Sequence, residues 1–242
     1  MTPPIGSPGS GRQLPLALRY PPDQRFDTFV AAPPGAVEQL RALAAGTGSD
    51  WLYLAGPAAT GKSHLVMAAC AHAQVQGRRV AYVPMTSAVG RLEQALASLQ
   101  EYDLVALDGL DLMAGQRADE IALFDFHNRA RVSGTGVLYA ARVPPDELPL
   151  TLPDLRSRLG QCTRIRVDVL DDEGRRQVLR VRADRRGLQI DEAAIDWLLR
   201  RVERDLGSLT GLLDRLDRES LAAQRRITVP FLRELMSASQ LQ

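Results

Sequence analysis

Lysine is almost absent from this chain. Of the 30 lysine and arginine residues, only Lys62 is a lysine. The ammonium of lysine is a compact point charge and the guanidinium of arginine is a flat fork, so the two are not interchangeable against a phosphate chain. The lone lysine therefore marks a position where a compact charge is required, and its neighbours are the strongest indication of function.

Cysteines are scarce, and long hydrophobic runs are missing. The two cysteines among 242 residues, Cys70 and Cys162, exclude a disulfide framework, and we expect both to fill the core in a reducing compartment. No apolar stretch approaches the ~20 residues of a membrane span, and the N-terminus lacks the apolar core of a signal peptide. A net charge of +1 gives no global attraction to nucleic acid or membrane. We predict a cytoplasmic protein with no membrane partner.

The residues around Lys62 match the phosphate-binding pattern G-x-x-x-x-G-K-[ST], called a P-loop. Glycines let successive N–H groups turn toward a phosphate chain, and the helix that follows presents its positive end to the same anion. An apolar strand pattern precedes the motif and an apolar helix pattern follows it, as this site requires. We predict that Lys62 neutralises phosphates and that Ser63 holds Mg²⁺. The phosphate-binding residues are Gly56, Pro57, Ala58, Ala59, Thr60, Gly61, Lys62 and Ser63.

After a tail rich in proline, glycine and serine, apolar strand patterns alternate with helical ones. Such alternation predicts a parallel sheet covered by helices on both faces. From residue 171 onward only helical patterns remain, which predicts a small second domain. The 45% of hydrophobic residues suffices for both cores. We expect strands near 51–55, 79–83, 104–108, 137–141 and 164–167, and C-terminal helices at 171–185, 191–204, 208–224 and 229–236.

A second motif, Leu104–Asp108, is an apolar strand that ends in a carboxylate. In P-loop proteins a strand of this kind delivers an aspartate that organises Mg²⁺, and we assign Asp108 that role. An acid expected directly after it is replaced by Gly109. Asp111 has two interpretations: a substitute base, or a carboxylate that solvates a turn.

Two arginines in Leu152–Leu159, Arg156 and Arg158, are separated by one residue, so on a helix they point in different directions. One could be held inward by Asp154 while the other projects toward a neighbouring subunit, as an arginine finger must. The alternative is a pair of solvated surface arginines.

Arginines are concentrated in the C-terminal region. They could form a solvated, salt-bridged face or a contact for DNA or an acidic partner. The arginines are Arg175, Arg176, Arg180, Arg182, Arg185, Arg186, Arg200, Arg201 and Arg204. The interleaved acids are Asp171, Asp172, Glu173, Asp184, Glu203 and Asp205.

Near the N-terminus, Gln13 precedes three leucines at alternating positions, Leu14, Leu16 and Leu18. In an extended segment these leucines share one side and could fill a hydrophobic groove on a partner. A first strand that folds back on the domain would have the same pattern.

The order of these pieces resembles the Hda family, AAA+ proteins that inactivate the replication initiator DnaA. The resemblance runs from Gln13 to Met236. It rests on Gln13–Leu18, Phe26–Phe29, Gly56–Ser63, Leu104–Asp108, Leu152–Leu159, Leu213–Asp217 and Ala223–Phe231.

The resemblance implies that Gln13–Leu18 binds the β sliding clamp and that DNA is contacted mostly through the clamp. It implies that Arg158 is inserted against the ATP of DnaA as an arginine finger, so that DnaA hydrolyses its ATP and re-initiation of replication is blocked. Family members that bind nucleotide favour ADP, with ATP as the alternative, and ADP keeps them monomeric. Nucleotide-dependent self-association is therefore expected.

The sequence departs from the AAA+ pattern where hydrolysis residues are expected. Besides Gly109, the sensor position at the end of the fourth strand is apolar, with Ala140 and Ala141 followed by a displaced Arg142. Gly207 stands where the lid usually supplies an arginine. Loss of one charge-stabilising group costs ~10²-fold or more, so we predict little or no ATP hydrolysis by this chain alone.

We therefore expect a tail at 1–22 with the clamp segment 13–18, an AAA+ P-loop α/β domain with a five-stranded parallel sheet at 23–169, and a helical lid domain at 170–242. The alternatives are an autonomous AAA+ ATPase such as a helicase loader, which should retain its sensors, and a non-catalytic clamp-binding scaffold with a vestigial P-loop.

Overall fold

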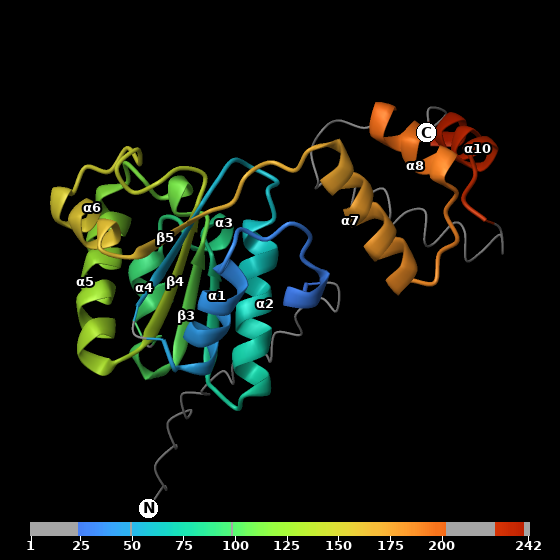
Figure 1. The fold of residues 1–242 in the computed structure, drawn as a ribbon. Coiled ribbons are helices and arrows are strands. Elements are labelled where there is room, and N and C mark those ends of the chain that lie inside the picture. Colours follow the sequence, from blue (N-terminus) through green and yellow to red (C-terminus); the bar gives the residue numbers. More distant parts are fainter. Residues whose placement is uncertain (1–23, 49, 98, 202–225, 240–242) are drawn as a thin grey trace, which may run out of the picture.

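A computed structural model describes residues 24–48, 50–97, 99–201 and 226–239. A five-stranded sheet with the order β2-β3-β4-β1-β5 forms the centre, and every pair of neighbouring strands is parallel (Figure 1). This confirms the predicted sheet, and each strand begins and ends within one residue of its predicted bounds. The strands are β1 Leu52–Ala55, β2 Val80–Pro84, β3 Leu104–Asp108, β4 Gly136–Ala141 and β5 Thr163–Arg166.

Side chains of each central strand alternate between two apolar cores, because successive residues of a strand point to opposite faces. In β1, Tyr53 belongs to one core and Leu54 to the other. The Tyr53 core includes helices α4 (Leu92–Leu96), α5 (Arg117–Ser133) and α6 (Pro153–Gly160), and the Leu54 core includes α1 (Ala36–Ala45) and α2 (Lys62–Val75). The short elements are α3 (Met85–Ala88), η1 (Phe26–Thr28), η2 (Leu99–Glu101) and η3 (Leu110–Leu112).

The parallel arrangement gathers the predicted nucleotide residues at one edge of the sheet, because all strands end there. The P-loop follows β1, Asp108 ends β3, and Ala141 ends β4. The backbone N–H of Gly56 donates to the carbonyl of Ala141 (3.3 Å), and that of Gly109 donates to Ala140 (2.8 Å). The residues that follow β1 and β3 are thus both hydrogen-bonded to the end of β4.

The C-terminal helices form a separate domain with its own apolar core. They are α7 (Asp172–Arg185), α8 (Glu192–Arg201) and α10 (Val229–Ser239), and Figure 1 shows them beside the sheet domain. The side chain of Asp171 caps α7 by accepting the N–H of Gly174 (2.7 Å). The helices predicted at 171–185, 191–204 and 229–236 are present. Residues 202–204 of the second helix lie outside the described residues. The whole helix predicted at 208–224 also lies outside them.

Ion pairs occupy several of the lid arginines. Arg180 pairs with Glu192 (2.7 Å), Arg176 with Asp196, and Arg175 with Asp172. This supports the interpretation of a salt-bridged face for α7 and α8. Cys70 and Cys162 are buried and free, as expected. None of the helices in the described ranges is long and apolar enough to span a membrane.

Candidate functional site

The P-loop backbone approaches its neighbours so closely that its two glycines cannot be replaced without movement. A Cβ on Gly56 would lie 2.0 Å from the carbonyl oxygen of Val167. Gly61 has φ +95°, and a Cβ there would lie 2.6 Å from the ring of Phe29. Gly61 directly precedes α2, so the free N–H groups of the first turn of that helix open onto the loop. This geometry meets the requirement of a phosphate site, close backbone approach and free N–H groups at a helix N-terminus.

Lys62 is bound within its own loop. Its Nζ donates to the carbonyls of Gly56 and Pro57, both at 2.6 Å, and its side chain is only 9% exposed. Burial lowers the pKa of Lys62, while the negative charge of Asp108 opposes that shift. A bound phosphate would accept these hydrogen bonds in place of the carbonyls, and its negative charge would neutralise the ammonium of Lys62. Ser63, exposed in the first turn of α2, stands beside it as the candidate Mg²⁺ ligand.

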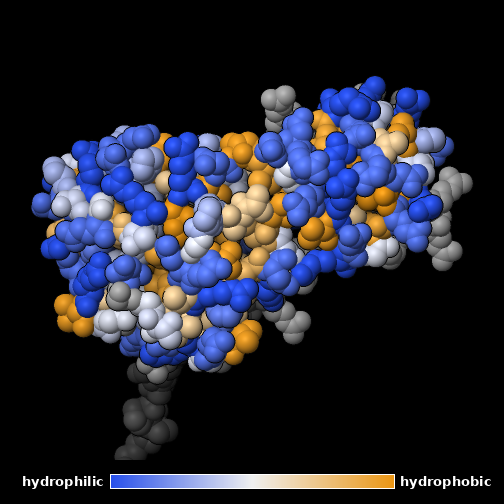
Figure 2. Space-filling view, viewed as in Figure 1, coloured by the Kyte–Doolittle hydropathy of each residue, from blue (hydrophilic) through white to orange (hydrophobic). Residues whose placement is uncertain are grey.

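A cavity of about 240 Å³ extends from the P-loop to the lid domain. Phe29, Val30, Leu170 and Val178 give it apolar walls, and Lys62 and Arg182 also line it. A flat apolar ring attached to a phosphate chain needs this combination of surfaces. The residues present therefore fit a nucleotide. Figure 2 shows hydrophobic residues on the surface at the junction of the two domains.

The two candidate carboxylates have different surroundings. Asp108 accepts a hydrogen bond from the hydroxyl of Tyr82 (3.0 Å) and lies at the end of β3, at the edge of the P-loop. Asp111 accepts the backbone N–H of Arg142 (3.0 Å) and pairs with the guanidinium of the same residue (3.2 Å). Asp108 stays the better metal candidate, and the turn-stabilising interpretation of Asp111 is favoured.

The positions where the AAA+ pattern has groups that activate water carry no polar side chain here. Gly109 has φ +91°, a conformation that an L-residue adopts only at a cost. Ala140 and Ala141 at the end of β4 are fully buried. Gly207 lies outside the described residues. The backbone conformation thus disfavours a side chain at position 109, and small apolar residues pack at the end of β4.

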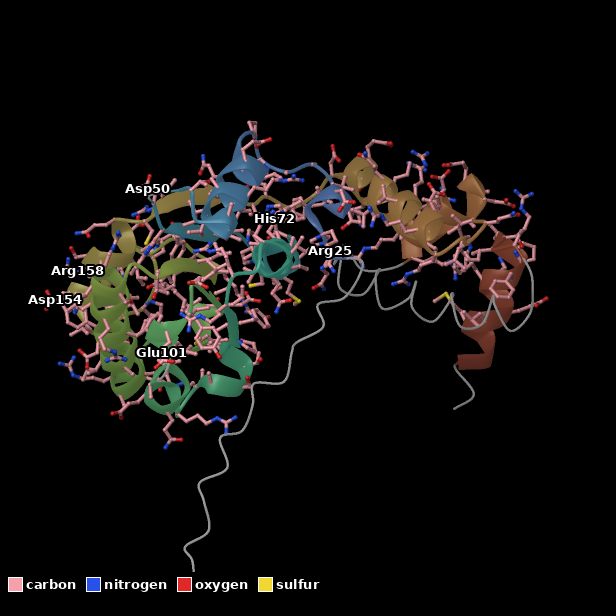
Figure 3. The ribbon with its side chains drawn as sticks, turned by 90° about the horizontal axis from the view of Figure 1, so that it is seen from below. Arg25, Asp50, His72, Glu101, Asp154 and Arg158 are labelled. Atoms are coloured by element: carbon pink, nitrogen blue, oxygen red, sulfur yellow. The ribbon has the colours of Figure 1, made fainter. Side chains whose placement is uncertain are left out.

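The two arginines of α6 differ sharply. Arg156 is half-buried, and its guanidinium donates to the carbonyls of Leu150 (2.8 Å) and Leu148 (3.3 Å). These carbonyls, and not Asp154, hold it inward. Arg158 is exposed, and its guanidinium makes no hydrogen bond or ion pair with any described residue. Figure 3 places it at the end of the molecule opposite the lid domain. The predicted clamp segment, Gln13, Leu14, Leu16 and Leu18, lies outside the described residues.

Comparison with known proteins identifies the C-terminal domain. Residues 172–236 match the family model described as "Hda, lid domain". The C-terminal domain is therefore similar to the lid domain of Hda proteins. The resemblance of the chain to Hda proteins is thereby confirmed.

Solved structures support an AAA+ fold for the chain. Domain III of DnaA from Thermotoga maritima is 19% identical, with a TM-score of 0.77 over 91% of this chain and 98% of that one. AMPPCP-bound DnaA from Aquifex aeolicus is 19% identical, with a TM-score of 0.67 over 81% of this chain and 65% of that one. The RuvB branch migration motor of Thermotoga maritima is 18% identical, with a TM-score of 0.65 over 89% of this chain and 72% of that one. Identities this low establish the fold alone.

Sequence reasoning missed the residue that anchors α6 of this Hda-like chain. Glu120 in α5 is fully buried and accepts the N–H groups of Gly115 (2.8 Å), Thr151 (2.9 Å) and Leu152 (2.7 Å), and the hydroxyl of Thr151 (2.8 Å). Burial raises its pKa, but the hydrogen bonds together outweigh burial and the pKa is lowered. One feature of the sequence could have indicated such a residue. The N-cap of α6 is Leu152, which has no side-chain oxygen, so another group must accept the free N–H groups there.

A second missed contact joins the N-terminal segment to the P-loop helix. Nε2 of His64 lies 2.8 Å from the carbonyl of Arg25 and 3.2 Å from the hydroxyl of Thr28. The rings of His64 and Phe29 meet edge to face, with centroids 5.2 Å apart. The contact fixes the Phe29 ring against Gly61 and so shapes one wall of the cavity. His64 directly follows Ser63, but the sequence does not show which segment its ring would meet.

Proposed function

We propose that this chain is a regulatory adaptor that promotes hydrolysis of the ATP bound to DnaA. Gln13, Leu14, Leu16 and Leu18 bind the β sliding clamp loaded on DNA. Arg158 acts as an arginine finger on the nucleotide of DnaA. The consequence is negative regulation of the initiation of replication.

The observation that carries this proposal is the contrast between the two arginines of α6. Arg156 is occupied by the carbonyls of Leu148 and Leu150, whereas Arg158 projects into solvent at the end opposite the lid. A guanidinium that serves another subunit must be exposed and set on a rigid element. Helix α6 supplies that element, because Glu120 holds the N-cap residue Leu152 and Arg156 ties the helix to the preceding loop.

Arg158 would stabilise the negative charge that develops on the transferring phosphoryl group of DnaA-bound ATP. A finger supplied in trans is worth about 10³- to 10⁵-fold in rate in other P-loop systems. Attacking water and Mg²⁺ belong to the DnaA site in this scheme. This chain contributes one charge and its position.

The P-loop of this chain binds ADP, or ATP, together with Mg²⁺. DnaA from Aquifex aeolicus, which has a similar fold, was solved with AMPPCP. Lys62 would hold the phosphates, and Ser63 and Asp108 would hold the metal. Because Gly109, Ala140 and Ala141 supply no polar group, bound nucleotide would act as a structural ligand rather than as a substrate.

The test measures loss of labelled ATP pre-bound to DnaA, with clamp loaded on DNA, in the presence and absence of this protein. We expect hydrolysis that requires both the protein and the loaded clamp. Arg158→Ala should reduce the stimulated rate by about 10³-fold or more, to the level of DnaA alone.

Two controls separate the finger from the clamp contact. Arg129→Ala removes another exposed arginine and should leave the rate unchanged. Replacement of Gln13, Leu16 and Leu18 by alanine should abolish clamp pull-down but keep ADP binding. Full stimulation by Arg158→Ala would refute the assignment of the finger, and no stimulation by the parent protein would favour a clamp-binding scaffold.

A further inference from the structure

The cavity beside the P-loop receives a cationic side chain from the lid domain that the function above leaves unused. Arg182 of α7 lines this cavity together with Lys62. We propose that Arg182 is the contact between the lid and the phosphates of bound nucleotide, in place of the arginine that is missing at position 207. The inference rests on the proposed binding of nucleotide at the P-loop.

The geometry of α7 sets Arg182 against the P-loop. Val178 and Arg182 are four residues apart, so they share one face of the helix, and both line the cavity. Arg182 is half-buried, whereas Arg180 points to the other side and pairs with Glu192 of α8. Only one of these two neighbouring arginines therefore turns toward the sheet domain.

Charge on the cavity wall favours an anion. Lys62 approaches from the sheet domain and Arg182 from the lid, and no carboxylate occurs among the described residues that line the cavity. Thr60 and Ser63 add hydroxyls on the P-loop side. A guanidinium donates two parallel hydrogen bonds to a phosphate, which an apolar lid residue cannot replace. A diphosphate held between the two cations would meet complementary charge on both sides.

The helix that carries Arg182 is attached to the N-terminal segment one turn further along. Arg185 pairs with Asp27 of η1 at 2.6 Å, and the pairing lowers the pKa of Asp27. The next residues, Thr28, Phe29 and Val30, form another wall of the same cavity. This ion pair therefore sets α7 beside the cavity, with Arg182 facing inward. Nucleotide held by both Lys62 and Arg182 would link the two domains directly.

The test is competition of ADP and of adenosine against a fluorescent ADP analogue, measured for the parent protein and for Arg182→Ala. We expect Arg182→Ala to weaken ADP about 10-fold, the usual effect of one charge-assisted hydrogen bond, and to leave adenosine unchanged. Arg182→Lys, which keeps the charge but loses the fork, should recover part of the affinity for ADP.

The matched control is Arg180→Ala on the same helix, which should bind ADP as the parent does. Parent-like ADP binding by Arg182→Ala, with binding lost in Lys62→Ala, would overturn the inference and leave the P-loop assignment standing. An equal loss of ADP and adenosine would also overturn it, because the arginine would then shape the base pocket. Failure of the parent to bind ADP would remove this inference together with the proposed binding of nucleotide at the P-loop, while the role proposed for Arg158 would be unaffected.

Discussion

The P-loop and helix α6 each present a cation, but in opposite ways. Lys62 is 9% exposed and donates to carbonyls of its own loop, whereas Arg158 is exposed and has no partner among the described residues. Nearby acidic groups differ as well. Asp111 is paired with Arg142 beside the P-loop, while Glu120 is bound entirely to backbone and hydroxyl groups that support α6.

This difference indicates where the chain can act on a phosphate. Among the described residues at the P-loop, Gly109, Ala140 and Ala141 supply no polar side chain, so we expect a bound nucleotide to be held but not readily cleaved. At α6, buried polar groups fix the position of Arg158, whose guanidinium makes no hydrogen bond or ion pair with the part of the chain that the structure describes. The reactive phosphate is therefore expected on a partner, and the following changes test that division.

Removal of the Glu120 carboxylate should have the largest effect on stability and should act on the α6 end alone. Glu120→Ala leaves the N–H groups of Gly115, Thr151 and Leu152 without their acceptor, at a cost of about 3 kcal/mol in the free energy of unfolding. Urea unfolding measures the loss. In the folded variant the stimulated hydrolysis should fall, because α6 is no longer fixed, while ADP affinity should not change.

Glu147→Ala is the matched control, because Glu147 is exposed in the loop before α6. It should keep both stability and stimulation. A Glu120→Ala protein that keeps full stimulation at saturating concentration would show that the position of Arg158 does not depend on this anchor. The claim that buried polar groups fix Arg158 would then be wrong.

Acid should weaken the α6 end through His127 of α5. Burial lowers the pKa of His127 to about 4, with smaller contributions from the charges of Arg131 and Arg158. The unfolded chain binds a proton near its ordinary pKa of 6.5, so stability is present above that pH and is lost as the pH falls toward 4. Between about pH 7 and about pH 5 the loss is roughly 2 kcal/mol.

His127→Gln should flatten this dependence, because glutamine does not titrate and its amide can still reach the hydroxyl of Tyr139, 3.0 Å from Nδ1 in the parent. Urea unfolding at several pH values checks the slope. If parent and variant lose stability equally over this range, His127 is not the group that responds, and the acid sensitivity must be sought elsewhere.

Patterns in the sequence predicted the sheet and the place of the glycine-containing loop between β1 and α2 well, because both depend on local order. The strands are short apolar runs between turn residues, and a parallel sheet brings their ends to one edge whatever the side chains there. Asp108 and Lys62 could therefore be assigned to one end of the sheet. The separation of Arg156 from Arg158 also followed from helical geometry alone.

The partners of these residues could not be predicted in the same way. Arg156 binds the backbone carbonyls of Leu148 and Leu150. Every residue has such a carbonyl, so the residue type does not show which ones will accept a hydrogen bond. Glu120 resembles any acid in the first turn of a helix until the loop before α6 packs against it. Arg182 differs from Arg180 only in the direction of its side chain, which depends on how the lid domain meets the P-loop.

The smallest expected effect comes from an attempt to rebuild hydrolysis at the P-loop. Gly109→Glu restores the missing acid, but at φ +91° any side chain costs about 1 kcal/mol, and Gly109→Ala should cost the same. Neither variant should release phosphate from ATP faster than the parent, because Ala140 and Ala141 remain buried and apolar. Phosphate release and urea unfolding measure both quantities. A tenfold faster release of phosphate in Gly109→Glu, but not in Gly109→Ala, would mean that one residue separates this site from an active ATPase. The P-loop could then also act on a phosphate, and the division between the P-loop and α6 would not hold.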